Sequence, residues 1–221
     1  TMKLTLSGIQ TDRAAFEAAG YKLPSFDYDA VKKQTQERPV WIHFGVGNIF
    51  RAFQANVVQR LLDANAMDTG LIAAEGYDYE IVQKSHDNLT ILATLKADHT
   101  VDKTVIGSIM EALVLDSKNE AQYTRLKEIF ASPSLQMASF TITEKGYAVN
   151  DAKGVVLPAV AADFEKGPDA PDSYLGKVVS LLYHRYVSGK LPIAMVSMDN
   201  CSHNGDKLKK AVLAFADAWC D

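Results

Sequence analysis

Short apolar runs alternate along this chain with segments of helical periodicity. Four runs, each ending in glycine or polar residues, predict buried strands at 40–44, 71–74, 137–142 and 193–196. Apolar residues that recur every three or four positions predict helices at 49–62, 120–131, 174–187 and 206–219. Strands and helices that alternate in this way predict a Rossmann-like, doubly wound α/β domain, in which helices cover both faces of a mainly parallel sheet.

The remaining segments have weaker patterns. Residues 89–95 and 101–115 are rich in Thr, Val and Ile, which favours further strands. Residues 148–173 collect prolines and glycines and are interpreted as a long surface loop. The mixed, turn-rich residues 1–38 are expected to form an N-terminal extension packed on the main domain, which then comprises residues 39–221.

Composition excludes several classes of function. The 221 residues are 48% apolar and carry a net charge of −4, which fits a soluble globular domain and gives no basic surface for nucleic acid. No apolar run approaches the ~20 residues that cross a bilayer, and the first residues have no apolar stretch of signal-peptide length. Two cysteines, Cys201 and Cys220, do not make a disulfide framework. We therefore expect a cytoplasmic protein with no membrane partner.

Candidate chemistry collects where the strands end. Ligands of an open parallel sheet bind beyond the carboxyl ends of its strands. Four polar or glycine-rich segments follow the predicted strands, and we expect them at one edge: 45–48, 75–78, 143–146 and 197–200.

The segment after the first strand has the features of a dinucleotide-binding loop. Gly45 permits a tight turn, and Gly47 lets the backbone approach a pyrophosphate at the start of a helix that Asn48 would cap. Arg51, in the first helical turn, could add a phosphate contact. The third position of the usual glycine pattern is Phe50 instead of Gly or Ala, so an ordinary strand-to-helix turn is the alternative.

An acidic residue at the end of the second strand would bind the adenosine ribose and favour NAD over NADP. Glu75 and Asp78 both stand there, 30 and 33 residues after Gly45. Either could accept the ribose hydroxyls, and the alternative is that both are solvated loop carboxylates.

With these segments in place, the sequence resembles the polyol-specific long-chain dehydrogenases, which include mannitol 2-dehydrogenase and fructuronate reductase (D-mannonate oxidoreductase). The matching stretches run in order along residues 40–216: 43–54, 105–109, 143–147 and 197–205. A bulky residue such as Phe50 is common in the family's glycine loop, so Ile49 and Phe50 are assigned to the cofactor site with their neighbours. The family more often has a His before the Arg and another after the Ala, where this chain has Phe50 and Phe53, so the resemblance does not fix the substrate.

The resemblance also implies roles for residues at the other strand ends. Asn200 would donate a hydrogen bond to the carbonyl or alkoxide oxygen, Glu144 would face the site and relay a proton, and Lys145 would make structural or phosphate contacts. The alternatives are an Asx turn at Asn200 and solvated charges at Glu144 and Lys145. The five histidines have no metal-ligand spacing, so no catalytic metal is expected.

The family's catalytic lysine lies in a Lys-x4-Asn-x2-His segment of a helical C-terminal domain, and no such segment occurs in residues 1–221. We therefore expect this chain to supply the NAD-binding part of an oxidoreductase acting on a sugar alcohol or hexonate, with little activity of its own. The alternatives are a non-catalytic nucleotide-binding or regulatory module and, with less support, a methyltransferase.

Overall fold

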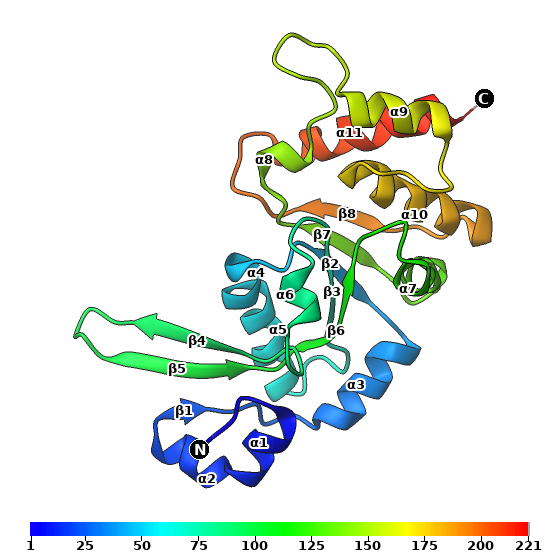
Figure 1. The fold of residues 1–221 in the computed structure, drawn as a ribbon. Coiled ribbons are helices and arrows are strands. Elements are labelled where there is room, and N and C mark those ends of the chain that lie inside the picture. Colours follow the sequence, from blue (N-terminus) through cyan, green and yellow to red (C-terminus); the bar gives the residue numbers. More distant parts are fainter. Residues whose placement is uncertain (221) are drawn as a thin grey trace.

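The computed structural model describes residues 1–220, and its centre is a five-stranded parallel sheet (Figure 1). The strand order is β6-β3-β2-β7-β8. The strands are β2 (Trp41–Phe44), β3 (Leu71–Glu75), β6 (Ile109–Val114), β7 (Met137–Phe140) and β8 (Ala194–Ser197). The predicted parallel, doubly wound sheet is confirmed.

The order in which strands are added to the sheet reverses at β2, between β2 and β7. The chain first proceeds from β2 outward to β3 and β6, and it then returns to the other side of β2 to form β7 and β8. In the parallel register, Phe44 lies beside Ala74 on β3 and beside Phe140 on β7. The carboxyl ends of these strands therefore meet at one edge, and the gap between the turns after β2 and β7 is the topological switch point.

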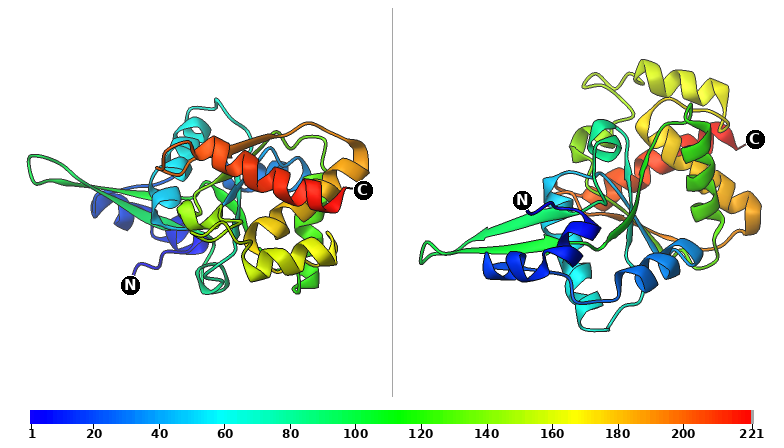
Figure 2. Two further views of the ribbon diagram at one scale, coloured as in Figure 1. Left: turned by 90° about the horizontal axis from the view of Figure 1, so that it is seen from above. Right: turned by 60° about the horizontal axis from the view of Figure 1, so that its bottom comes forward.

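Helices cover both faces of the sheet because side chains alternate between the faces along each strand. Ile42 and Phe44 pack on one face in a cluster with α7 (Glu120–Ala131), α10 (Tyr174–Gly189) and α11 (Asn204–Trp219). Leu71 and Ala73 face the other side, which is covered by α3 (Tyr28–Glu37), α4 (Asn48–Ala52) and α5 (Gln54–Asp63). Figure 2 shows α11, in red, along the outer side of the molecule.

The N-terminal residues pack on a projecting hairpin. Strands β4 (Thr90–Leu95) and β5 (Val101–Ile106) are antiparallel, and β1 (Tyr21–Lys22) adds to β5 to make a second sheet in the order β1-β5-β4. Helices α1 (Leu6–Thr11) and α2 (Arg13–Ala18) lie against its base, where Phe16 and Leu23 are buried with Leu89 and Val105. The far end of the hairpin extends away from the rest of the molecule (Figure 1).

Several expectations from the sequence differ from the structure. The predicted loop 148–173 contains a helix, α9 (Pro158–Lys166), because Pro158 occupies the first helical turn, where proline is tolerated. The apolar stretch 101–115 is divided at Gly107 and Ser108, so that β5 joins the hairpin while β6 joins the main sheet. Asn48 does not cap α4, because Gly47 takes the capping position and Asn48 is the first helical residue.

Within residues 1–220 no helix combines the length and apolar character needed to cross a membrane.

Candidate functional site at the switch point

The two glycines after β2 have different roles in the turn. Gly45 has φ +105°, a conformation that side chains rarely allow, and a Cβ atom there would lie 2.1 Å from the carbonyl oxygen of Thr141. The turns after β2 and β7 therefore pack against each other through Gly45. A Cβ atom on Gly47 would meet nothing within 4 Å, so the backbone at Gly47 is open to an incoming molecule.

Helix α4 and Phe53, the residue that follows it, contribute one buried and two exposed apolar side chains. Phe50 is fully buried and stacks on the His43 ring, with the ring centroids 4.1 Å apart. Ile49 and Phe53 are 73% and 65% exposed, so the apolar periodicity of residues 49–62 does not place Phe53 in the core. The reason is that α5 turns a different face, including Ala55 and Val58, toward the sheet. Phe50 therefore packs in the core beside the glycine loop, whereas the Ile49 side chain is exposed on the surface of the protein.

Arg51 and Glu75 hold the glycine loop from two sides. Arg51 Nε donates to the carbonyl oxygen of Val46 at 3.0 Å. Burial lowers the pKa of Arg51, and the nearby Glu75 carboxylate partly offsets this effect. Glu75 is itself buried, and its Oε2 accepts the backbone N–H of Val46 at 2.9 Å. Both side chains thus bind the backbone of the same loop residue.

Glu75 and Asp78, the two candidates for the ribose contact, differ in exposure. Glu75 Oε1 accepts the N–H groups of Gly76 and Tyr77, both at 3.0 Å, so each of its oxygens already has a backbone partner. Asp78 is exposed, and its Oδ1 accepts the N–H of Glu80 at 3.2 Å, where α6 (Glu80–Gln83) begins. The second oxygen of Asp78 is therefore available to a ligand.

Asp199 connects the turns after β7 and β8 through hydrogen bonds, and the sequence alone did not distinguish it from its neighbours. Its carboxylate accepts the N–H groups of Ile142 at 2.9 Å and Thr143 at 3.0 Å, and also the hydroxyl of Tyr147. Thr143 has φ +63°, which is unusual for a β-branched residue. Burial and the Asp199 carboxylate raise the pKa of Tyr147, so its hydroxyl stays a donor. Asp199 therefore fixes a strained turn at the edge of the switch point.

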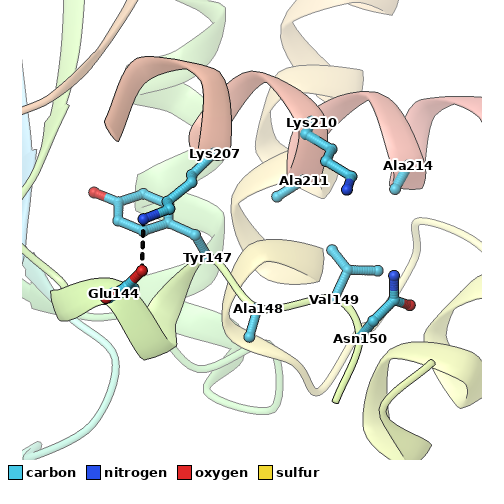
Figure 3. A pocket seen from close by; sticks show the side chains of 9 residues that line it. All are labelled: Glu144, Tyr147, Ala148, Val149, Asn150, Lys207, Lys210, Ala211 and Ala214. Atoms are coloured by element: carbon cyan, nitrogen blue, oxygen red, sulfur yellow. Dashed lines mark hydrogen bonds and ion pairs between the residues drawn. The ribbon is translucent and has the colours of Figure 1, made fainter. Parts of the chain in front are cut away.

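Glu144 and Lys145 lie on the short helix α8 (Thr143–Gly146), next to this turn. Glu144 forms an ion pair with Lys207 of α11 at 2.5 Å, with its own side chain 66% exposed. Both residues line a cavity of about 300 Å³ between α8, residues 148–150 and α11. Figure 3 shows Glu144 and Lys207 at one end of this cavity and Asn150 with Lys210 toward the other. Lys145 is exposed and forms no ion pair with any residue that the structure describes.

Asn200 is exposed after β8, and its side chain makes no hydrogen bond within residues 1–220. The adjacent turn is closed by Asn204 instead, whose amide donates to the carbonyl oxygens of Ser197 at 3.1 Å and Asp199 at 3.0 Å. The amide of Asn200 is therefore free to meet a molecule in solution.

The structure thus divides the sequence-predicted residues among three places. The glycine loop, Arg51 and Glu75 are in direct contact at the end of β2, whereas Asn200, Glu144 and Lys145 lie in the turns after β7 and β8. Asp78 lies in the turn after β3. Across the described part of the chain, no three His, Cys, Asp or Glu side chains are arranged to hold a metal ion.

His43 is a further buried polar residue at this edge, and the sequence did not distinguish it from other strand residues. Its Nδ1 lies 2.7 Å from Ser139 Oγ, and its Nε2 lies 2.7 Å from Thr141 Oγ1. Burial lowers the pKa of His43 to about 3, so the ring is neutral at physiological pH. The only sequence signal for His43 was its place as a polar residue in an apolar strand, two positions before the predicted glycine loop.

Residues 40–220 match the family model described as the mannitol dehydrogenase Rossmann domain. The chain is 48% identical over 211 residues to the D-mannonate oxidoreductase of Thermotoga maritima, an alignment that covers 94% of this chain and 39% of that protein. It is 31% identical to the polyol:NADP oxidoreductase of Gluconobacter oxydans, over 90% of this chain and 41% of that protein.

A solved structure shares the fold. The ternary complex of Pseudomonas fluorescens mannitol 2-dehydrogenase with NAD and D-mannitol superposes with a TM-score of 0.76 and 28% identity, covering 91% of this chain and 40% of that one. The chain therefore spans about two fifths of the length of these relatives.

Proposed function

The chain belongs to the mannitol dehydrogenase family as its Rossmann domain, and on this premise we propose that it binds NAD(H) at the switch point and forms the cofactor-binding part of a dehydrogenase. The substrate would be a sugar alcohol or hexonate that is interconverted with its ketone. The observation that carries the proposal is the glycine loop, in which Gly45 is fixed against Thr141 while Gly47 is open.

The residues present fit a dinucleotide. A side chain at Gly47 would fill the open space beside the loop, which is the space that a pyrophosphate needs. Val46 is held from both sides by Arg51 and Glu75, so the loop is preorganised before any ligand binds. When bound, the nicotinamide supplies the hydride acceptor or donor, and the protein supplies orientation and electrostatics.

We assign the adenosine ribose to the turn after β3. Asp78 has a free carboxylate oxygen for the ribose hydroxyls. The buried Glu75 carboxylate stands at the start of the same turn. Two carboxylates in this turn would repel a 2′-phosphate, so NAD is proposed over NADP.

The turns after β7 and β8 would face the substrate. The Asn200 amide could donate a hydrogen bond to the substrate oxygen, but an amide cannot take the proton that leaves an alcohol. Glu144, which forms an ion pair with Lys207, could relay that proton. Lys145, which is exposed, would contact phosphate. A strong general base would come from a second domain, which the family resemblance places in a longer chain.

Among substrates, mannonate with fructuronate is proposed ahead of mannitol with fructose, because the 48% identity to a D-mannonate oxidoreductase exceeds the identity to the other relatives named above. The free thiols of Cys201 and Cys220 fit a reducing compartment, and we propose the cytoplasm.

A second candidate is a nucleotide-binding module without catalysis of its own. The side chains at the strand ends favour it, because the Asn200 amide cannot take a proton and Glu144 is ion-paired with Lys207. In either case the dinucleotide occupies the same loop, so the two candidates differ in turnover and not in binding.

Two measurements test the proposal. In an NADH titration, we expect saturable energy transfer from tryptophan, because Trp41 lies on β2 just below the glycine loop. A Trp219→Phe variant removes the signal of the distant tryptophan and should keep the transfer. In an assay with NAD and mannonate or mannitol, this chain should turn over far below the ordinary range of about 1 s⁻¹ and above. The absence of saturable NADH binding would refute both candidates, whereas ordinary turnover would show that the base lies within residues 1–221.

A further inference from the structure

A line of four polar side chains runs along the seam between β2 and β7 and ends at the glycine loop. In the parallel register, His43 of β2 lies beside Ser139 of β7. Trp41 Nε1 donates to Ser139 Oγ at 2.7 Å, Ser139 Oγ lies 2.7 Å from His43 Nδ1, and His43 Nε2 lies 2.7 Å from Thr141 Oγ1. Phe50 covers this line by stacking on the His43 ring.

The donor and acceptor capacities of these side chains determine which atom donates in each of the three hydrogen bonds. The indole N–H of Trp41 can only donate, so Ser139 Oγ is the acceptor in that bond. Ser139 is fully buried, and within residues 1–220 the only acceptor in reach of its hydroxyl hydrogen is His43 Nδ1. Since buried donors are almost always satisfied, Nδ1 accepts. A neutral imidazole then carries its hydrogen on Nε2 and donates it to Thr141 Oγ1.

The hydroxyl hydrogen of Thr141 is consequently left without a protein acceptor in the part of the chain that the structure describes. Thr141 is the half-buried residue directly after β7, and its N–H donates to the carbonyl oxygen of Phe44 at 3.0 Å. Its Oγ1 would lie 3.1 Å from a Cβ atom on Gly45. The Thr141 hydroxyl therefore lies beside Gly45 of the glycine loop, at the switch point, and can donate one hydrogen bond to a ligand.

We propose that the Thr141 hydroxyl donates this hydrogen to a pyrophosphate oxygen of bound NAD(H), and that His43 is the positioning residue that directs it there. The inference rests on the proposed function, because it requires the dinucleotide at the switch point. It explains why a buried histidine lies under the loop, because only a side chain with both a donor and an acceptor can connect Ser139 to Thr141 with a fixed polarity.

The binding test compares Thr141→Val, which keeps the shape and loses the hydroxyl, with Thr141→Ser, which keeps the hydroxyl. We expect Thr141→Val to weaken the binding of NADH and of ADP-ribose about tenfold, and Thr141→Ser to stay within about twofold of the unsubstituted chain. AMP has no pyrophosphate, so its affinity should be the same in all three proteins. Circular dichroism confirms that each variant is folded.

The outcomes separate this inference from the proposed function. Failure of the unsubstituted chain to bind NADH would refute the proposed function. Normal NADH affinity in folded Thr141→Val, or an equal loss for AMP, would overturn the role of Thr141 alone. Because Thr141→Val leaves the Nε2–H of His43 without its acceptor and could unfold the chain, a second measurement uses the unsubstituted protein. Nitrogen NMR of cofactor-free protein should find the His43 proton on Nε2, and a proton on Nδ1 would overturn the proposed direction.

Discussion

The buried carboxylate of Glu75, at the end of β3, accepts the backbone N–H of Val46 in the glycine loop at 2.9 Å. The loop after β2 is thus fixed by a residue of the neighbouring strand. The other oxygen of Glu75 accepts two further backbone N–H groups, from Gly76 and Tyr77. An acidic residue at this position therefore determines the shape of the loop, in addition to any contact with a ribose.

Replacement of Glu75 by Gln should destabilise the fold and weaken NADH binding. In the Glu75→Gln variant one carboxylate oxygen is replaced by an NH₂ group, which is a donor and cannot accept the backbone N–H groups that it faces. Leaving these buried donors unsatisfied should lower the free energy of unfolding by about 1–3 kcal/mol. Urea denaturation measures the loss. The matched control is Asp78→Asn, because Asp78 is exposed and the free energy of unfolding should change by less than about 0.5 kcal/mol. Equal stability of the two variants would contradict the structural role of Glu75.

The choice between NAD and NADP should depend on the charge of the turn after β3. We expect the unsubstituted chain to bind NAD more tightly than NADP, and Asp78→Asn to narrow that difference by roughly one to two powers of ten, since one or two charge-assisted hydrogen bonds are weakened. Calorimetric titration with each cofactor measures the ratio. If the unsubstituted chain bound both cofactors equally, neither carboxylate could be the ribose contact.

The two glycines of the loop should respond in opposite ways to substitution. Gly47→Val places its side chain in open space, so the fold should persist while NADH binding is lost. Gly45→Ala would bring Cβ to within 2.1 Å of the carbonyl oxygen of Thr141 at φ +105°, and should cost roughly 2 kcal/mol or more of folding free energy. Thermal unfolding and NADH titration separate the two effects. Retained NADH affinity in folded Gly47→Val would argue against the loop as the cofactor site.

Stability should fall as the pH drops below about 6.5. Burial lowers the pKa of His43 from 6.5 to about 3, so the folded protein keeps this ring neutral while the unfolded chain takes up a proton. The unfolded state then binds more protons between these values, and stability rises with pH up to about 6.5 and levels off above it.

For a single histidine, the difference in unfolding free energy between pH 8 and pH 5 is about 2 kcal/mol. Urea denaturation at several pH values measures it. His184 also has a lowered pKa, caused mainly by burial and also by Lys127, so His184→Gln is the control and should retain most of the slope. His43→Asn should be less stable and should lose most of the slope over this range, keeping only the smaller contribution of His184. An unchanged slope in His43→Asn would contradict the neutral, buried ring.

The sequence predicted the parts of the fold that depend on local pattern. The apolar runs and the glycine pair located β2, β3, β7 and β8 with the first turn of α4, because buried parallel strands are continuously apolar. The helix α9 was missed because Pro158 resembles a helix breaker unless its place in the first turn is known. Local pattern also could not show that Gly107 and Ser108 separate two strands of different sheets.

The sequence singled out candidate site residues most readily where a residue acts through its own position in the chain. Gly45 and Gly47 act through their backbone, so their spacing was informative. Glu75, Asp199 and His43 act through partners that are 29, 57 and 96 residues away in the sequence, on Val46, Ile142 and Ser139. Such contacts depend on the register of neighbouring strands, which a single sequence does not specify.

The central claim, that the switch point between β2 and β7 holds the dinucleotide, is tested most directly by mapping amide NMR shifts as NADH is added to this chain. We predict saturable shifts concentrated in residues 45–51, 75–78 and 141–144, with the residues around the cavity at 148–150 and 207–214 changing little. Shifts centred on that cavity, or none that saturate, would contradict the claim.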